Sequence, residues 1–120
     1  MVGVWIGGNG TDCWIEFDLG ANYLISKYQL GSMCYSGDYG YSPSDWTLSG
    51  WASGHRGDAA TLLDTQAAYP VAHWTTPPGI NQFTLATPML CRYLRVAVTD
   101  TCSHNLDNVV VLSNIDFFGG

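Results

Sequence analysis

Charged side chains are scarce in this chain of 120 residues. Asp, Glu, Lys and Arg together make up 12% of the sequence, about half of the ~25% that is usual for soluble domains. Only four of them are basic against ten acidic, which gives a formal net charge of −6. Binding to a phosphate backbone needs clusters of Lys and Arg, so nucleic acid is excluded as a partner. The same shortage argues against a membrane-binding polybasic patch, and no apolar run approaches the ~18 residues that span a bilayer.

Signatures of catalytic sites are also missing. The sequence has no G-x-S-x-G elbow, no H-E-x-x-H pair and no glycine-rich phosphate loop ahead of a helix. Glu16 is the one glutamate, so a pair of glycosidase carboxylates cannot be placed. We therefore expect a binding domain and no enzyme.

Four cysteines are present, and none of them forms a C-x-x-C pair, so a zinc site is not expected. Cys13, Cys34, Cys91 and Cys102 could form two disulfides in any of three pairings, or remain buried thiols. No signal peptide is visible at the N-terminus, whereas Asn9 opens a glycosylation sequon. An even cysteine number in a small domain favours an extracellular, cell-surface or virion-surface location.

Short runs of alternating apolar side chains fill the rest of the sequence, and 14 Gly and five Pro separate them. The runs span residues 13–19, 28–30, 46–52, 61–66, 83–85, 94–98 and 109–118. Residues 59–68 are also compatible with one helix. The pattern predicts a single all-β domain over residues 1–120, an antiparallel β-sandwich or jelly roll.

Five segments, in order, resemble the strands of the discoidin domain, also called the factor V/VIII type C domain, of the galactose-binding-like fold that includes many carbohydrate-binding modules. The segments are WIEFDLG (14–20), PSDWTLSG (43–50), TLLDT (61–65), RYLRV (92–96) and VLSNIDFFG (111–119). Two departures matter. Of the family's first strand only Val4 and Trp5 are present, so that strand is absent or comes from another chain. Asn114 stands where many members place a calcium-binding Glu, so a structural calcium is doubtful and we expect no cofactor.

The resemblance implies that loops at one end of the sandwich bind the ligand. Two segments there are rich in aromatic, amide and acidic groups, which suit the C–H face and hydroxyl rim of a sugar. The candidate sugar-binding residues are Tyr35, Asp38, Tyr39, Tyr41, His104, Asn105, Asp107 and Asn108. The alternative is that they only form turns.

The resemblance also places Cys34 and Cys102 at this end, where a disulfide between them would join the two loops. Cys13 and Cys91 would then pair by elimination or stay free.

Other singled-out residues are expected to be structural. Trp14, Phe17, Trp46, Leu94, Val96 and Phe117 are predicted core residues, while Trp51 and Trp74 are undecided. Arg92 and Arg95 are expected to pair with acids such as Asp18 or Asp116. The tripeptide at 56–58 (RGD) is interpreted as a chance match in a turn.

The leading hypothesis is a non-catalytic, lectin-like adhesion domain that binds cell-surface or extracellular glycans. The alternative is a structural subunit of a filament, virion or tail fibre, assembled from copies of itself through strand or loop contacts. A phospholipid-binding domain ranks third, because the loops are acidic and a membrane partner is unlikely.

Overall fold

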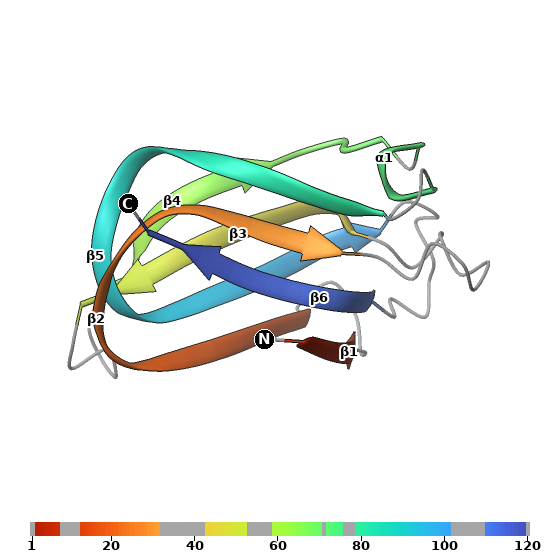
Figure 1. Cartoon of the computed structure of the whole chain (residues 1–120). Coiled ribbons are helices and arrows are strands. Elements are labelled where there is room, and N and C mark those ends of the chain that lie inside the picture. The colour runs from red at the N-terminus through yellow and green to blue at the C-terminus, as the bar shows by residue number, and fades with distance from the viewer. Residues whose placement is uncertain are drawn as a thin grey trace.

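The computed structural model describes residues 2–7, 13–31, 43–52, 59–70, 72–75, 79–101 and 110–119. These residues form antiparallel strands and one short helix (Figure 1). In chain order the elements are β1 (Val2–Gly7), β2 (Cys13–Gly31), β3 (Pro43–Trp51), β4 (Thr61–Gln66), α1 (Ala72–Thr75), β5 (Ile80–Thr101) and β6 (Val110–Phe118). Among the described residues no helix has the length and apolar character needed to cross a membrane.

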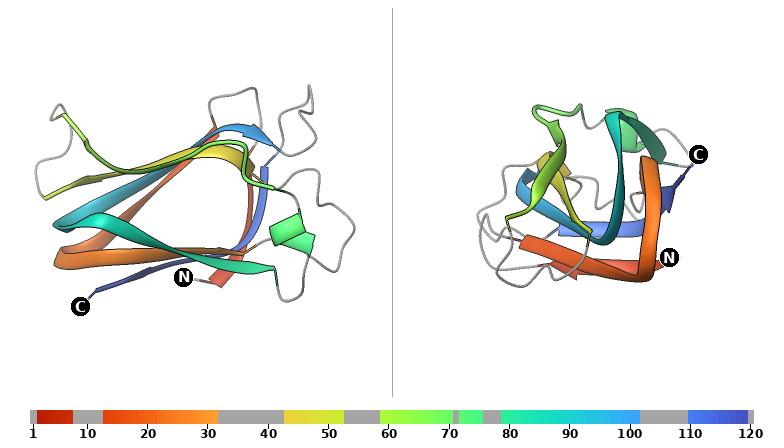
Figure 2. Two further views of the ribbon diagram at one scale, coloured as in Figure 1. Left: turned by 90° about the horizontal axis from the view of Figure 1, so that it is seen from above. Right: turned by 90° about the vertical axis from the view of Figure 1, so that its left-hand side faces the viewer.

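Two long strands, β2 and β5, turn the sheet into a sandwich. They pair antiparallel along their lengths, with irregularities near Asp18–Tyr23 and Ile25–Lys27, and both bend there (Figure 2). The strand order is β1-β6-β2-β5-β3-β4. Layer A contains β4, β3, residues 93–101 of β5 and residues 13–18 of β2. Layer B contains residues 80–84 of β5, residues 27–31 of β2, β6 and β1. The predicted all-β sandwich is confirmed.

The core between the layers follows the alternation of the sequence. Fully buried side chains come from every long strand and include Tyr28, Leu30, Trp46, Leu48, Leu94 and Val96. Phe17 is buried too, and its ring meets that of Phe117 edge-on at 5.3 Å between centroids. The undecided Trp51 and Trp74 are both buried.

The core prediction is wrong for Trp14, which is 51% exposed. Successive side chains of a strand point to opposite faces, so Trp14 shares its face with Glu16 and Asp18, while Ile15 and Phe17 point inward. The core prediction rested on the place of Trp14 inside an alternating strand, but its parity within that strand decides which face it occupies.

Two other expectations have definite outcomes. Residues 61–66 form the edge strand β4, and the helix considered for 59–68 does not form. A strand does precede β2, since β1 pairs antiparallel with β6 from Val2 opposite Asn114 to Gly7 opposite Val110.

Of the two outcomes left open for Cys13 and Cys91, a disulfide or free thiols, the structure has the second for Cys91, which is a buried free thiol. Cys13 lies opposite Val98, seven residues along β5 from Cys91, which corresponds to roughly 20 Å of strand. A disulfide needs Cα atoms within about 7 Å. The antiparallel register of β2 and β5 therefore keeps the two cysteines apart.

Candidate functional site

Four strand ends that border the predicted binding loops lie together at one end of the sandwich. In the ladder, Gly31 at the end of β2 is opposite Asn114 of β6, and Pro43 at the start of β3 is opposite Thr101 at the end of β5. These ends, with α1 beside them, lie away from the bends of β2 and β5 (Figure 1). We call this the loop end, and the opposite end the bend end.

The eight predicted sugar-binding residues lie outside the described residues, in the segments 32–42 and 102–109 that the strand ends border. Asn9, Cys34 and Cys102 lie outside them as well, as does the tripeptide at 56–58. The placement of the eight sugar-binding candidates and of Cys34 and Cys102 at the loop end therefore stays a prediction.

The described part of the loop end is a segment fastened to the start of β3. The backbone N–H of Tyr69 donates to the carbonyl of Ser44 at 2.9 Å, and the indole N–H of Trp74 donates to the carbonyl of Pro43 at 2.9 Å. Trp74 is fully buried, where it packs near Trp46 and Tyr69. These bonds hold α1 and the residues before it against the strand that follows segment 32–42.

Asp45 organises the backbone beside this attachment. Its carboxylate accepts the N–H of Ala68 at 2.8 Å and the hydroxyl of Ser44 at 3.2 Å. Ala68 has a φ of 54°, in the left-handed region that side chains other than glycine rarely adopt. The carboxylate thus stabilises a strained turn that would otherwise cost on the order of 1 kcal/mol.

Two rings at the loop end were not predicted as site residues. Tyr69 and the exposed His73 meet edge-on, with 4.8 Å between ring centroids. Burial raises the pKa of the Tyr69 hydroxyl. The side-chain amide of Asn81 donates to the carbonyl of His73 at 3.1 Å and so ties α1 to β5. The sequence could have pointed to Tyr69 and His73 as site residues, because they lie in a Pro-containing connection between two strands, and binding residues often lie in such connections.

Asn114, which the sequence resemblance aligned with a calcium-binding Glu, takes part in an amide network. Its side-chain oxygen accepts from the amide of Gln29 at 3.0 Å, and the oxygen of Gln29 accepts from Gln82 at 3.0 Å. Within the described ranges no group of three or more His, Cys, Asp or Glu side chains could hold a metal ion.

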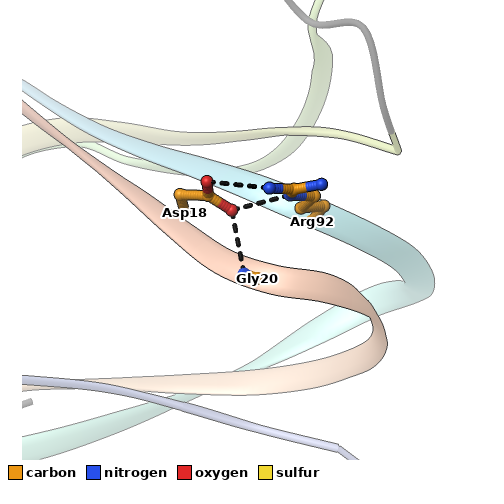
Figure 3. A network of polar contacts seen from close by, with 3 residues as sticks. All are labelled: Asp18, Gly20 and Arg92. Atoms are coloured by element: carbon orange, nitrogen blue, oxygen red, sulfur yellow. Dashed lines mark hydrogen bonds and ion pairs between the residues drawn. The ribbon is translucent and has the colours of Figure 1, made fainter.

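Arg92 pairs with Asp18, as expected from the sequence. The guanidinium contacts the carboxylate through two bonds, Nε to Oδ1 at 2.8 Å and Nη2 to Oδ2 at 3.1 Å, and Oδ1 also accepts the N–H of Gly20 at 2.8 Å (Figure 3). Hydrogen bonding to Asp18 raises the pKa of Arg92. Arg95 pairs instead with Glu16, at 3.5 Å.

Two shallow recesses lie at the bend end. One, of about 440 Å³, is lined by Leu19, Tyr23, Leu24, Ile25, Phe117 and Gly119. The other, of about 420 Å³, is lined by residues 61–63 and 86–89. Both linings are predominantly apolar and offer few hydrogen-bonding groups for the hydroxyls of a sugar.

A scan against protein-family models gave no match, and neither did a search of curated proteins. Many solved structures do resemble this one. The family 32 carbohydrate-binding module of Streptococcus pneumoniae EndoD has a TM-score of 0.73 at 12% identity, over 98% of this chain and 75% of that chain. CpGH89CBM32-5 from Clostridium perfringens, solved with GalNAc-β-1,3-galactose, has a TM-score of 0.73 at 11% identity, over 97% and 75%.

Chitosan-binding module 1 of a chitosanase/glucanase from Paenibacillus sp. IK-5 has a TM-score of 0.71 at 17% identity, over 97% of this chain and 76% of that one. These likenesses show that the chain shares the galactose-binding-like fold of such modules.

Proposed function

We propose that this chain, which has the fold of family 32 carbohydrate-binding modules, is a non-catalytic glycan-binding domain whose site is the loop end. The observation that carries the proposal is the fold likeness over nearly the whole chain, with TM-scores of 0.73 to neighbours that are carbohydrate-binding modules. One of them was solved with GalNAc-β-1,3-galactose, and another, from AlyQ, with 4,5-unsaturated mannuronic acid. A discoidin-type adhesion role on an extracellular surface is part of the proposal.

The composition of the two loop segments supports this assignment. Tyr35, Tyr39 and Tyr41 offer aromatic faces for the C–H groups of a pyranose, and segment 102–109 offers amide, imidazole and carboxylate groups for its hydroxyls. The scarcity of Lys and Arg favours a neutral ligand over a phosphorylated or sulfated one.

The start of β3, which supports the loop end, is held in place by hydrogen bonds, and this favours a rigid binding site. Strand β3 begins directly after segment 32–42, and its first residues are fixed by the bonds of Tyr69 and Trp74. A disulfide between Cys34 and Cys102, which we include in the proposal, would restrict both segments further. Order present before binding lowers the entropy that is lost when the ligand binds.

A glycan array followed by calorimetry tests the proposal. The array should include GalNAc-β-1,3-galactose, chitosan oligosaccharides and unsaturated mannuronic acid, the ligand types that the neighbours' names give. Binding that is weakened by Tyr39→Ala and unchanged by Tyr23→Ala, an exposed aromatic at the bend end, supports the loop end. A folded chain that binds no glycan contradicts the proposal.

One observation favours the alternative of a subunit assembled from identical copies. Leu24 and Leu90 are opposite each other in the β2–β5 ladder, and both are exposed at the bend end together with Tyr23. No charged residue occurs in 19–26 or 86–91, so acidic copies could approach each other through this end. Light scattering over a range of concentrations decides this point, and a monomer throughout contradicts self-association.

A further inference from the structure

The outer face of layer A presents side chains in three rows across the strands. Trp14 of β2 shares a row with Ala97 of β5 and Thr47 of β3, since both pairs are opposite in the ladder. The next row contains Glu16, Arg95, Ser49 and, in the edge strand β4, Leu62, and the third contains Asp18, Tyr93 and Trp51. Among the described residues, the other side chains in the row of Trp14, which belong to Ala97, Thr47 and Thr65 of β4, are small.

Trp14 is held in place although half of it is exposed. The guanidinium carbon of Arg95 lies 4.1 Å from the centre of the Trp14 ring and 5.4 Å from that of Trp51. Glu16 fixes the same guanidinium through the 3.5 Å ion pair. The indole is therefore supported by Arg95 while 51% of its residue surface remains accessible.

The charges of this face cancel in pairs. Arg95 is paired with Glu16 and Arg92 with Asp18, so four charged groups sum to zero. The chain as a whole carries −6, so the rest of the molecule carries the excess acidity. A neutral ligand meets no net repulsion here, and a charged one gains little from groups that are already paired.

We propose that the outer face of layer A, centred on Trp14, is a second contact site for glycans and binds an extended chain of neutral pyranose units. The proposal rests on the proposed function only for the class of ligand. Trp14 would stack on the C–H face of one sugar ring, while the carboxylate of Asp18, whose side chain is 49% exposed, accepts a hydrogen bond from a hydroxyl of a neighbouring ring.

The exposed apolar surface on this face argues for a sugar over a protein partner. A stable protein interface buries about 800 Å² on each side, around a cluster of anchoring side chains. Among the described members of the three rows the exposed large hydrophobic residues are Trp14 and Leu62, and they come from strands at opposite edges of layer A, three strand spacings or roughly 14 Å apart, so they form no cluster. One ring with a polar surround matches the size of a saccharide unit.

Affinity electrophoresis tests the site. The whole chain is run through native gels containing galactan, glucomannan or a soluble β-glucan, with chitosan and alginate as charged comparisons. We expect at least one neutral polysaccharide to retard the chain, and this retardation should not depend on salt. Trp14→Ala should weaken it by about tenfold, because the variant loses the stacking contact together with the surface that the contact buries.

Two further variants control the experiment. Tyr23→Ala removes an aromatic side chain of similar exposure at the bend end and should leave retardation unchanged. Ala97→Arg keeps Trp14 but places a long side chain in its row, and should lower retardation even if Trp14→Ala fails to fold. Thermal unfolding of each variant establishes that it is folded.

The outcomes separate the two proposals. If Ala97→Arg and folded Trp14→Ala are both retarded as strongly as the wild type, the outer-face site is overturned while the proposed site at the loop end is unaffected. The same conclusion holds if these substitutions change only self-association, as measured by light scattering. Loss of retardation in Trp14→Ala with unchanged affinity for a short oligosaccharide in calorimetry supports a separate site. A wild-type chain that no neutral polysaccharide retards overturns the inference, and binding of short oligosaccharides then decides the proposed function independently.

Discussion

The indole N–H of Trp46 donates a 2.9 Å hydrogen bond to the hydroxyl of Tyr28, and that hydroxyl donates to the carboxylate of Asp64 at 2.5 Å. The side-chain amide of Gln66 donates to the same carboxylate oxygen at 3.1 Å. Tyr28 comes from layer B, whereas Trp46 and Asp64 come from layer A. One phenol therefore joins the two layers through polar groups inside an apolar core.

Tyr28→Phe should lower the free energy of unfolding by about 2–4 kcal/mol, because it leaves the indole N–H without its acceptor and Asp64 without a buried donor. Urea unfolding measures the change. The control is Tyr23→Phe, in which the lost hydroxyl belongs to an exposed residue and stability should stay within about 0.5 kcal/mol of the wild type. Equal stability of the two variants contradicts a structural role for the network.

Stability should fall at alkaline pH. Burial and the bond to Asp64 raise the pKa of Tyr28 well above its ordinary value of 10.0, and burial raises that of Tyr69 too. Above pH 10 an unfolded tyrosine loses its proton while Tyr28 in the folded chain keeps it, so the unfolded state is favoured as pH rises. The urea midpoint should therefore fall from pH 9 to 11, with a smaller fall in Tyr28→Phe. A flat profile contradicts this prediction.

Gly50 sits where a side chain has little room. A Cβ there would lie 3.1 Å from Cδ1 of Leu63 and 3.4 Å from Sγ of Cys91. Gly50→Val should destabilise the chain by about 1–3 kcal/mol through overpacking. Ser49→Val adds bulk on the outer face of the same strand and should cost less. Urea midpoints compare the two, and an equal cost in both variants would contradict overpacking at Gly50.

Thiol titration tests the cysteine assignment. In denaturant without reductant we expect two reactive thiols, Cys13 and Cys91, with Cys34 and Cys102 in the proposed disulfide. In the folded chain Cys91 should react slowly, since burial hides it and raises the pKa of its thiol. Four reactive thiols in denaturant would contradict the proposed disulfide. A titration that finds no reactive thiol would contradict a free Cys91.

The fold could be predicted from the sequence because its strands alternate cleanly. Leu94, Val96 and Val98 point inward and their neighbours point outward, so the alternation of residue types predicts which side of β5 faces the core. The bends of β2 and β5 could not be predicted in this way. They depend on irregular pairing near Ile25 and Met89, where long-range contacts override the local pattern.

The site was harder to predict for a physical reason. Turn-forming residues and sugar-binding residues are the same types, so composition could nominate Tyr39 or His104 without assigning a contact. Tyr69 and His73 were missed because their proximity results from hydrogen bonds to Ser44 and from Asn81, which the sequence does not display. The prediction for Trp14 was wrong because membership of an alternating strand was taken to mean burial, whereas its parity within the strand points it outward.

The most direct test of glycan binding at the loop end is calorimetry with the best ligand from the array, on wild type, Tyr39→Ala and Tyr23→Ala. We expect the wild type and Tyr23→Ala to bind with equal Kd, and Tyr39→Ala to bind about tenfold more weakly, since losing one stacking contact and its buried area costs about 1.4 kcal/mol. If alanine variants of Tyr35, Tyr39, Tyr41 and His104, all proven folded, each bind as tightly as the wild type, the account of the loop end is contradicted.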